Sequence, residues 1–381
     1  MKIAVFGSGL MGATIARDLV GRKQVEQVTV CDVDRGRLRV LTHREHSSKL
    51  TVKVHDVRKR PATAKLLSRF DVGIGALPHG LSEYAINSAI KARVDFVDLI
   101  FGWRFGQAEI DSACRRRGIT IIPACGLAPG LTNILAMAAA ERMKRVSEVH
   151  IKVGGIPEKP RPPLNYRIVF SFQAVLEEYM RKARIVKHGR VKDVPALSGL
   201  ETITFRSPIG KCECFYTDGL STLVQTIRSV REMDEKTIRW PGHAEQIRTL
   251  IDCGLLETNP VSYQDLSIVP KEFVANILSD KLALKEERDI TLLRVDVSGR
   301  ENGEQARRRY EMIDHYDGRH GITSMARTTA FPCSIAAQIL ASGRISRTGL
   351  IPPELAFRDE LRTEFLDYLA ERGMKIKSTL R

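Results

Sequence analysis

The sequence of 381 residues lacks an apolar run of the roughly 18 or more residues that a membrane-spanning helix needs. It also lacks a charged-then-apolar leader with a small-residue cleavage site. Internal repeats and low-complexity segments are missing too. We therefore expect a cytoplasmic protein that has no membrane partner.

Paired cysteine motifs are absent as well. The seven cysteines are odd in number, scattered, and contain no C-x-x-C. Cys212 and Cys214 alternate as they would on a strand, but no other Cys or His pair stands at a spacing typical of zinc. We expect reduced, mostly buried thiols and no metal site.

Acidic residues are too few to balance the basic ones, and the net charge is +15. A basic protein attracts anions in general, including nucleic acids and phosphates. The charge is widely spread, however, and its small clusters at 115–117 and 307–309 are neither interleaved with aromatic residues nor set in a nucleic-acid-binding motif. A solvated basic surface without a specific nucleic-acid partner is the favoured interpretation.

What is present is a glycine pattern in residues 2–20, "KIAVFGSGLMGATIARDLV". An apolar strand pattern precedes the glycines and a helical pattern follows them. Gly7 permits the turn, Gly9 lets phosphates approach, and Gly12 lets the helix pack closely. Helix N-termini favour a pyrophosphate. The stretch therefore predicts a dinucleotide site, whose loop residues are Gly7, Ser8, Gly9, Leu10, Met11 and Gly12.

An acidic residue closes the next strand pattern. Asp32 lies 20 residues beyond Gly12, where its side chain can accept hydrogen bonds from the adenosine ribose and repel a 2′-phosphate. Asp32 and Val33 are thus predicted cofactor contacts, and NAD is favoured. Arg35 could attract a 2′-phosphate, so NADP stays open. The alternative for Asp32 is a helix cap or a turn residue.

Later strand patterns end in further candidate residues. Alternating strand and helix patterns predict an α/β fold with a doubly wound parallel sheet. Because the ends of parallel strands meet at one edge of the sheet, residues that follow them can line the cofactor crevice. The candidates are Asp56, Val57, Ala76, Leu77 and Pro78, with Asp98 at the end of another strand.

From about residue 124 the pattern changes. Apolar and polar residues alternate over 147–173 and 201–219, between glycine and proline turns, which predicts a second α+β domain with a mainly antiparallel sheet. Residues 289–318 are predicted to form a hairpin of outer strands. A helical pattern after Pro332 could return the chain to the first domain.

Several longer motifs carry a family resemblance. They include "GLAPGLTNIL", "GGIPEKPRPPLNYRI", "TIRWPGHAEQI" and "SMARTTAFPCSIAAQIL", and with "GSGLMG" and "GLIPPE" they extend in order from residue 7 to about 354. In these motifs the chain resembles the saccharopine dehydrogenase-like oxidoreductases, and within them most closely the NAD-dependent L-lysine 6-dehydrogenases.

The resemblance implies a Rossmann domain built from residues 1–123 and 326–381, and an α+β domain over 124–325 that carries the substrate and the contact of a homodimer. It implies oxidative deamination of a small amino acid at its C–N bond, the ε-amine of L-lysine first, with a site between the domains. The alternatives are an NADPH-dependent reductase of the saccharopine or carboxyspermidine type, and a regulatory subunit that binds a dinucleotide without catalysis.

The chain departs from the family at several positions. Gln173 stands where relatives often carry an arginine, which could bind a substrate α-carboxylate bidentately. Ala124 and Cys125 precede the "GLAPG" turn where relatives can carry an acid, and Leu99 and Ile100 stand where a serine is common. The reaction class is therefore better supported than the substrate.

Amine oxidation needs a neutral amine and hence a nearby proton acceptor. Asp98 and His79 are the candidates, against the alternatives of a structural Asp and a surface His. Arg327 and Thr328 could contact the cofactor or join the domains, and Asp218 is expected in a turn. Five residues are candidates for substrate binding, each with a capping, packing or surface alternative: Asn133, Tyr166, Arg167, Arg239 and His243.

Overall fold

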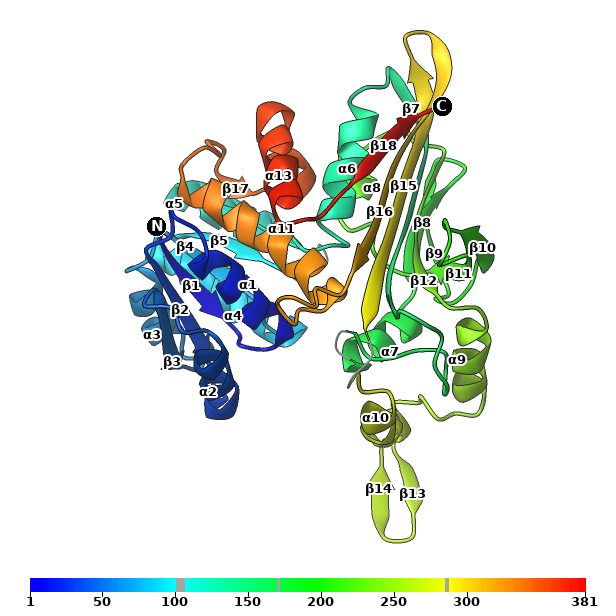
Figure 1. Cartoon of the computed structure of the whole chain (residues 1–381), viewed down its shortest axis with the longest axis horizontal. Coiled ribbons are helices and arrows are strands. Elements are labelled where there is room, and N and C mark those ends of the chain that lie inside the picture. Colours follow the sequence, from blue (N-terminus) through cyan, green and yellow to red (C-terminus); the bar gives the residue numbers. More distant parts are fainter. Residues whose placement is uncertain (101–106, 170–171, 285–287) are drawn as a thin grey trace. The chain divides into compact units, whose positions relative to one another are not determined.

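The computed structural model describes residues 1–100, 107–169, 172–284 and 288–381 (Figure 1). These residues form two compact units, between which the chain passes several times. The first unit comprises Met1–Ala138, Ser221–Thr226 and Ala326–Lys375, and the second comprises Ala139–Leu220, Ile227–Met325 and Ile376–Arg381. The first unit thus holds residues 124–138 and 221–226, which the sequence assigned to the α+β domain, while the last six residues belong to the second.

A parallel sheet of seven strands forms the centre of the first unit, in the order β17-β6-β5-β4-β1-β2-β3. Neighbouring strands in it pair in parallel throughout, which confirms the predicted doubly wound α/β fold. Its strands are β1 (Lys2–Phe6), β2 (Gln27–Asp32), β3 (Leu50–Val54), β4 (Val72–Gly75), β5 (Asp95–Asp98), β6 (Thr120–Ile122) and β17 (Gly349–Leu350).

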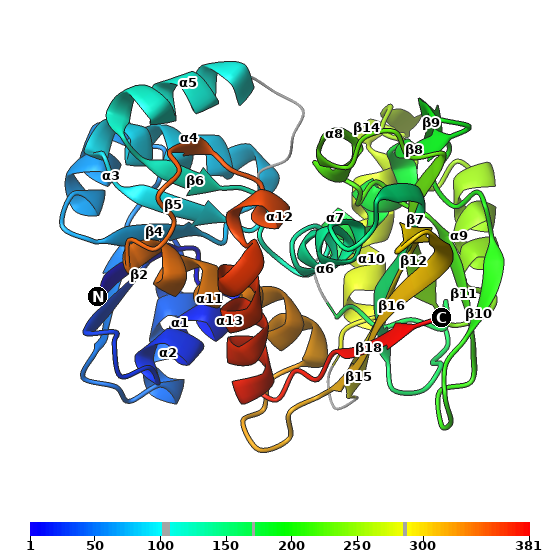
Figure 2. The ribbon, with the colours of Figure 1, turned by 90° about the horizontal axis from the view of Figure 1, so that it is seen from above.

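Helices cover both faces of this sheet. One face carries α3, α4 and α5, while α1, α11 and α13 lie along the other (Figure 2). The helices of the first unit, including two whose ends reach its boundaries, are α1 (Leu10–Val20), α2 (Arg35–Arg44), α3 (Arg60–Leu67), α4 (His79–Ala92), α5 (Gln107–Arg117), α6 (Leu131–Ala140), α8 (Leu223–Thr226), α11 (Ser324–Ala341), α12 (Pro353–Ala356) and α13 (Asp359–Glu371).

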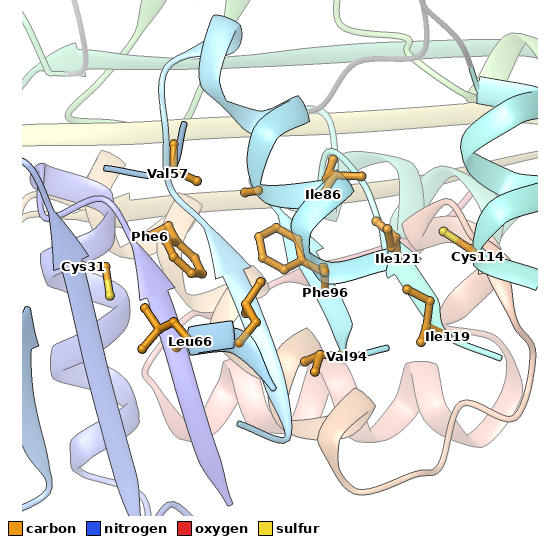
Figure 3. Packing of buried hydrophobic residues seen from close by; sticks show 14 of the residues in the cluster. Phe6, Cys31, Val57, Leu66, Ile86, Val94, Phe96, Cys114, Ile119 and Ile121 are labelled. Carbon is orange, nitrogen blue, oxygen red and sulfur yellow. The ribbon is translucent and has the colours of Figure 1, made fainter. Parts of the chain in front are cut away.

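Aromatic and aliphatic side chains fill the space between the sheet and the α3–α5 layer. Phe6 and Phe96 lie with ring centroids 6.4 Å apart, beside Leu66 (Figure 3). A Cβ at Gly73 would lie only 2.5 Å from the Phe96 ring, so β4 can pass under this ring only as glycine. The packing fixes the strand order that brings the ends of β1, β2 and β4 to one edge.

The second unit is built on a sheet of nine strands. Only β7 and β12 pair in parallel, and the remaining pairs are antiparallel, as predicted. The strands are β7 (Arg145–Pro157), β8 (Ala183–Lys187), β9 (Arg190–Val194), β10 (Glu201–Thr204), β11 (Lys211–Tyr216), β12 (Glu232–Arg239), β15 (Asp289–Glu301), β16 (Glu304–His315) and β18 (Lys377–Leu380).

Three helices and a small hairpin complete the second unit. A buried apolar cluster joins residues of α7 and α9, and α10 packs against that cluster with one side. The hairpin projects beyond α10, away from the large sheet (Figure 1). These elements are α7 (Phe172–Met180), α9 (His243–Asp252), α10 (Pro270–Lys281), β13 (Val261–Tyr263) and β14 (Leu266–Ile268).

Residues 289–318 form the predicted hairpin, in which β15 pairs with β16, but the expectation that both are outer strands was wrong. β15 lies inside the sheet, between β7 and β16. Its alternating charges indicated a solvent face, but Asp296 is buried and paired with Arg307 and Arg309 of β16. Charges that look exposed in the sequence are here neutralised by the neighbouring strand.

Two other predicted boundaries were wrong. The strand pattern over 147–173 stops at Pro157, because the prolines that follow have no N–H group for a sheet to bind. The returning helix begins at Ser324 rather than after Pro332. The Asp289 carboxylate accepts hydrogen bonds from the N–H groups of Ser324 and Met325, at 2.7 and 2.8 Å, and so satisfies donors at the helix start.

Candidate dinucleotide site and substrate residues

The turn between β1 and α1 requires glycine at two of its positions. Gly7 has a φ of 102°, and a Cβ there would lie 2.2 Å from the Ala76 carbonyl oxygen. A Cβ at Gly12 would lie 1.9 Å from the Gly7 carbonyl oxygen. No side chain fits these contacts, so both glycines are explained by packing inside the protein.

Gly9 differs, because a Cβ there would meet no described atom within 4 Å, and its φ is −65°. Packing therefore gives no reason for glycine at this position. Gly9 is the N-cap of α1, and no side chain caps the N–H groups of that helix. Open space beside uncapped N–H groups at a helix start fits a diphosphate, so these residues fit a dinucleotide.

Asp32 lies at the end of β2, next to this turn. Its Oδ2 accepts hydrogen bonds from the Ser8 N–H at 2.6 Å and the Ser8 hydroxyl at 2.8 Å, and its Oδ1 accepts one from the Asp34 N–H at 2.9 Å. Partial burial alone would raise the pKa of Asp32, but these hydrogen bonds outweigh it and lower the pKa. The carboxylate is therefore charged and fixed beside the glycine turn.

The other predicted cofactor residues differ in exposure. Val57 is buried in the apolar cluster under the sheet, and Asp56 forms an ion pair with Arg58 at 2.7 Å. The remaining ones lie nearer the surface. Leu10, Val33 and Pro78 are exposed, Ala76 and Leu77 are half-buried, and Met11 is buried in α1.

The two candidate proton acceptors lie in different environments. Asp98 is fully buried at the end of β5, where its Oδ1 accepts hydrogen bonds from the Ile100 N–H at 2.9 Å and the Ser82 hydroxyl at 3.2 Å. A Cβ at Gly75 would lie 2.0 Å from Asp98 Oδ2, so the carboxylate lies over the end of β4. His79 is exposed and begins α4.

Asn133 belongs to a buried polar group of the first unit. Its Nδ2 donates to the Thr222 hydroxyl at 3.4 Å. The hydroxyls of Thr222 and Thr226 both donate to Glu354 Oε1. Burial raises the pKa of Glu354, against hydrogen bonds that lower it. These contacts attach segment 221–226 to the first unit. No signal in the sequence indicated Glu354 beyond its place in "GLIPPE".

Three predicted substrate residues meet in one buried group of the second unit. The Arg239 guanidinium lies 5.1 Å from the centre of the Tyr166 ring, and that ring lies 5.2 Å from the His243 ring. Arg239 Nε donates to the Tyr179 hydroxyl at 2.7 Å, and that hydroxyl lies 2.9 Å from His243 Nε2. We call Tyr166, Tyr179, Arg239 and His243 the Arg239 cluster.

The hydrogen bonds of this cluster have one consistent direction. His243 Nδ1 lies 2.7 Å from the Leu164 carbonyl oxygen, which can only accept. Burial, followed by the charge of Arg239, lowers the pKa of His243 to about 3, so the ring is neutral. It donates from Nδ1 and accepts the Tyr179 proton at Nε2. Both nitrogens of His243 are thus engaged inside the second unit.

The remaining predicted residues are dispersed. Arg167 donates from Nη1 to the carbonyl oxygens of Arg161, Pro162 and Tyr166, and so holds its own loop. Asp218 lies 3.5 Å or less from Arg181 and Arg184. The side chain of Gln173 lies outside the described residues.

Arg327 and Thr328, near the start of α11, belong to the first unit. Arg327 donates to the Arg372 carbonyl oxygen at 2.6 Å, and its guanidinium lies over the Phe331 ring. Thr328 is fully buried. The printed contacts of Arg327 therefore connect α11 with the end of α13.

Sequence reasoning missed two acids beside the Arg239 cluster, of which Glu235 is buried and Glu178 is half-buried. Burial raises the pKa of Glu178, and it raises that of Glu235 well above the ordinary value, with the charge of Glu178 as the next cause. Glu235 accepts a hydrogen bond of 2.6 Å from the Thr217 hydroxyl. Glu235 lies in the polar-looking run "EMDEKTIR" of β12, which is buried almost throughout, so its pattern predicted exposure.

Within the described ranges, no group of three or more His, Cys, Asp or Glu residues is arranged to hold a metal ion. No helix among the same residues is long and apolar enough to span a membrane.

The strand order 3-2-1-4-5-6, the glycine turn and the acid at the end of β2 together define a dinucleotide-binding oxidoreductase of the Rossmann type. Comparison with family models is more specific. The saccharopine dehydrogenase C-terminal domain matches residues 126–374, and the saccharopine dehydrogenase NADP binding domain matches residues 3–122. The chain belongs to the saccharopine dehydrogenase family.

Individual relatives are distant. The chain is 22% identical to the mitochondrial alpha-aminoadipic semialdehyde synthase of Bos taurus, over 98% of this chain and 47% of that protein. It is 24% identical to the NADP+-dependent, L-glutamate-forming saccharopine dehydrogenase of Saccharomyces cerevisiae, over 75% of this chain and 65% of the relative. The chain thus spans about half to two thirds of these relatives.

A solved structure shares the fold. Apo saccharopine dehydrogenase (L-Glu forming) from Saccharomyces cerevisiae matches with a TM-score of 0.82 at 19% identity, covering 100% of this chain and 99% of that one. At this identity the likeness concerns the fold alone.

Proposed function

We propose that the protein is a nicotinamide-dependent dehydrogenase that oxidises a C–N bond of an amino acid related to lysine. The observation that carries this proposal is the opening at Gly9, where neither packing nor backbone strain requires glycine. Membership of the saccharopine dehydrogenase family supplies the reaction class. A bound nicotinamide would accept the hydride from the carbon that carries the nitrogen.

Different residues of the first unit would bind different parts of the cofactor. The N–H groups at the start of α1 bind the diphosphate, and Asp32 binds the adenosine ribose. We propose NAD as the cofactor because the charge of Asp32 would repel a 2′-phosphate. The matching family model and the yeast relative carry NADP in their names, so both cofactors belong in the test.

Asp98 is our choice for the group that holds the substrate ammonium or takes its proton. It lies at the carboxyl edge of the parallel sheet, where substrates of such folds bind. Hydrogen bonds to its Oδ1 keep the side chain in place. His79 is the second candidate. For the substrate carboxylate we propose Arg167 or Arg239, since Gln173 carries no charge.

The two possible reactions use different substrates and release different products. Saccharopine, a secondary amine, is favoured by the name of the yeast relative, and its oxidation at the bond used by that enzyme releases L-glutamate. L-lysine, favoured by the motifs, would release ammonia from its ε-carbon. We further propose that the protein is a homodimer and works in the cytoplasm.

The deciding experiment follows the absorbance of reduced nicotinamide with NAD or NADP over L-lysine, saccharopine, ornithine and carboxyspermidine. Glutamate and ammonia are assayed as products. Asp98→Asn should reduce kcat strongly while leaving cofactor affinity unchanged, and Asp95→Asn, at the other end of β5, is the matched control. Cofactor binding without turnover of any amine would refute the proposal and favour a regulatory subunit.

A further inference from the structure

The segment 255–281 of the second unit, which we call the arm, exposes an unusual amount of apolar surface. It contains α10 and the β13–β14 hairpin. Six of the 14 large hydrophobic residues that are exposed among the described residues lie in it, with exposed fractions between 40% and 61%: Leu255, Val261, Tyr263, Leu266, Phe273 and Ile277.

The elements of the arm are poorly supported by the rest of the chain. α10 has 12 residues, and none of them is buried. Val274 and Leu278 pack against the cluster of α7 and α9, while Phe273 and Ile277, one helical turn apart, remain exposed. The hairpin has two strands of three residues, and an isolated pair of strands is marginal in water. Exposed apolar side chains concentrated in one segment favour an interface there.

The charge of the arm indicates its partner. The arm carries four acidic residues and two basic ones, although the whole chain has a net charge of +15. None of these acids pairs with another described residue. Two arms would therefore repel each other, whereas a basic surface would attract them. The arm fits the basic body of a second copy better than a second arm.

The β8–β9 hairpin offers such a surface. The hairpin, residues 183–194, contains four basic residues and one acidic one, Asp193. Among the described residues β9 pairs only with β8, so within that part of the chain its other edge presents unpaired backbone groups. Val191 is 58% exposed, between the exposed Arg190 and Lys192. An open strand edge with an apolar centre and basic flanks matches an acidic, apolar hairpin in both hydrogen bonding and charge.

We propose that two copies of this chain dimerise by exchanging arms, the β13–β14 hairpin and α10 of each lying against the β8–β9 hairpin of the other. Such a contact is isologous, so each partner donates one arm and receives one. The proposal rests on the proposed homodimer and specifies the surface through which the two copies would bind, but it does not depend on the proposed reaction.

The first test measures the dimer dissociation constant by sedimentation over a dilution series. The double variant F273D/I277D should raise it about 30-fold or more, as loss of a central apolar contact does. The matched control is Val40→Asp, at a residue of α2 that is 53% exposed; it should leave the constant unchanged. A monomeric wild-type protein would overturn both the homodimer and the arm contact. A dimer insensitive to F273D/I277D would overturn the arm contact alone.

The second test uses charge reversal. Asp265→Lys in the arm and Lys192→Glu in β9 should each weaken the homodimer up to about 30-fold, since an exposed pair contributes up to about 1 kcal/mol and the isologous dimer contains two such pairs. In a mixture of the two variants, every arm faces a β9 of opposite charge, so the heterodimer should regain wild-type affinity. A mixture no tighter than either variant alone would overturn the placement of the arm on β9.

Discussion

In the β1–α1 turn, we expect some glycines to be required for folding and another only for ligand binding. Gly7 and Gly12 are required by contacts inside the protein, whereas a Cβ at Gly9 meets open space. We expect Gly9→Ala to lower dinucleotide affinity about tenfold or more, with a free energy of unfolding within about 0.5 kcal/mol of the wild type. Titration of reduced-nicotinamide fluorescence and urea denaturation measure the two quantities.

A matched glycine tests this interpretation. Gly80 lies in the first turn of α4, and a Cβ there also meets nothing within 4 Å. Gly80→Ala should leave the affinity unchanged and raise the free energy of unfolding by up to about 1 kcal/mol, because alanine favours a helix over glycine, while Gly12→Ala should lose stability as well as affinity. If Gly9→Ala binds dinucleotide like the wild type, the phosphates do not lie at the α1 N-terminus.

Glu235 makes the second unit sensitive to pH. Burial and the neighbouring Glu178 raise its pKa well above the ordinary glutamate value of 4.5. Above pH 4.5 the unfolded chain releases the Glu235 proton, while the folded protein retains it. The free energy of unfolding therefore falls as pH rises from 4.5 to the pKa of Glu235 in the folded protein. Glu235→Gln, which cannot ionise, should flatten the fall and be more stable than the wild type at alkaline pH.

Urea denaturation from mildly acidic to alkaline pH checks this expectation. Glu304→Gln, at an exposed acid that begins β16, is the control and should follow the wild-type profile. A Glu235→Gln profile parallel to that of the wild type would mean that Glu235 is ionised in the folded protein.

The sequence predicted the dinucleotide residues better than the substrate residues. The glycine turn and Asp32 are local features, because a few adjacent residues set both their geometry and their chemistry. Tyr179 contacts Arg239, and Glu178 lies near Glu235. The first residue of each pair lies in α7 and the second in β12, so these contacts form only when the helix packs against a strand that is distant in the sequence. No residue spacing in the sequence predicts such a contact. The roles proposed for Asp98, His79 and the arginines remain predictions.

Elements with strong local signals are the ones whose bounds the sequence predicted. β1 and α1 follow directly from the apolar run and the glycines. The position of β15 in the sheet depends instead on β7 and β16. The burial of Asp296 could not be predicted, because it is possible only through its salt bridges to the neighbouring strand. The start of α11 depends on Asp289, which precedes Ser324 by 35 residues.

The β15–β16 hairpin depends on its two-residue turn. Asn302 and Gly303 have φ angles of 51° and 89°, the positive values that tight hairpin turns demand. Gly303→Ala should lower the free energy of unfolding by about 1 kcal/mol, since a Cβ disfavours this conformation. Urea denaturation measures the change, and Gly80→Ala serves again as the control. An unchanged stability would mean that the turn relaxes without cost.

At the scale of the whole molecule, neither unit is one continuous stretch of chain. The parallel sheet of the first unit needs β17, and its buried helix α11 comes from beyond residue 325. A fragment of residues 1–138 should therefore lack cooperative unfolding and bind no dinucleotide, although it contains the complete glycine turn. Circular dichroism during thermal denaturation and a fluorescence titration test this. A fragment that folds and binds would show that six strands suffice.

The last strand has a consequence for the timing of synthesis. β18 leaves the first unit and pairs with β16 at the edge of the second. A ribosome adds about 5–20 residues each second, so β16 is made several seconds before the strand that pairs with its outer edge. Until β18 emerges, the growing chain presents an open strand edge to its neighbours on the same messenger. Closely spaced ribosomes should therefore favour contacts between growing chains through this edge.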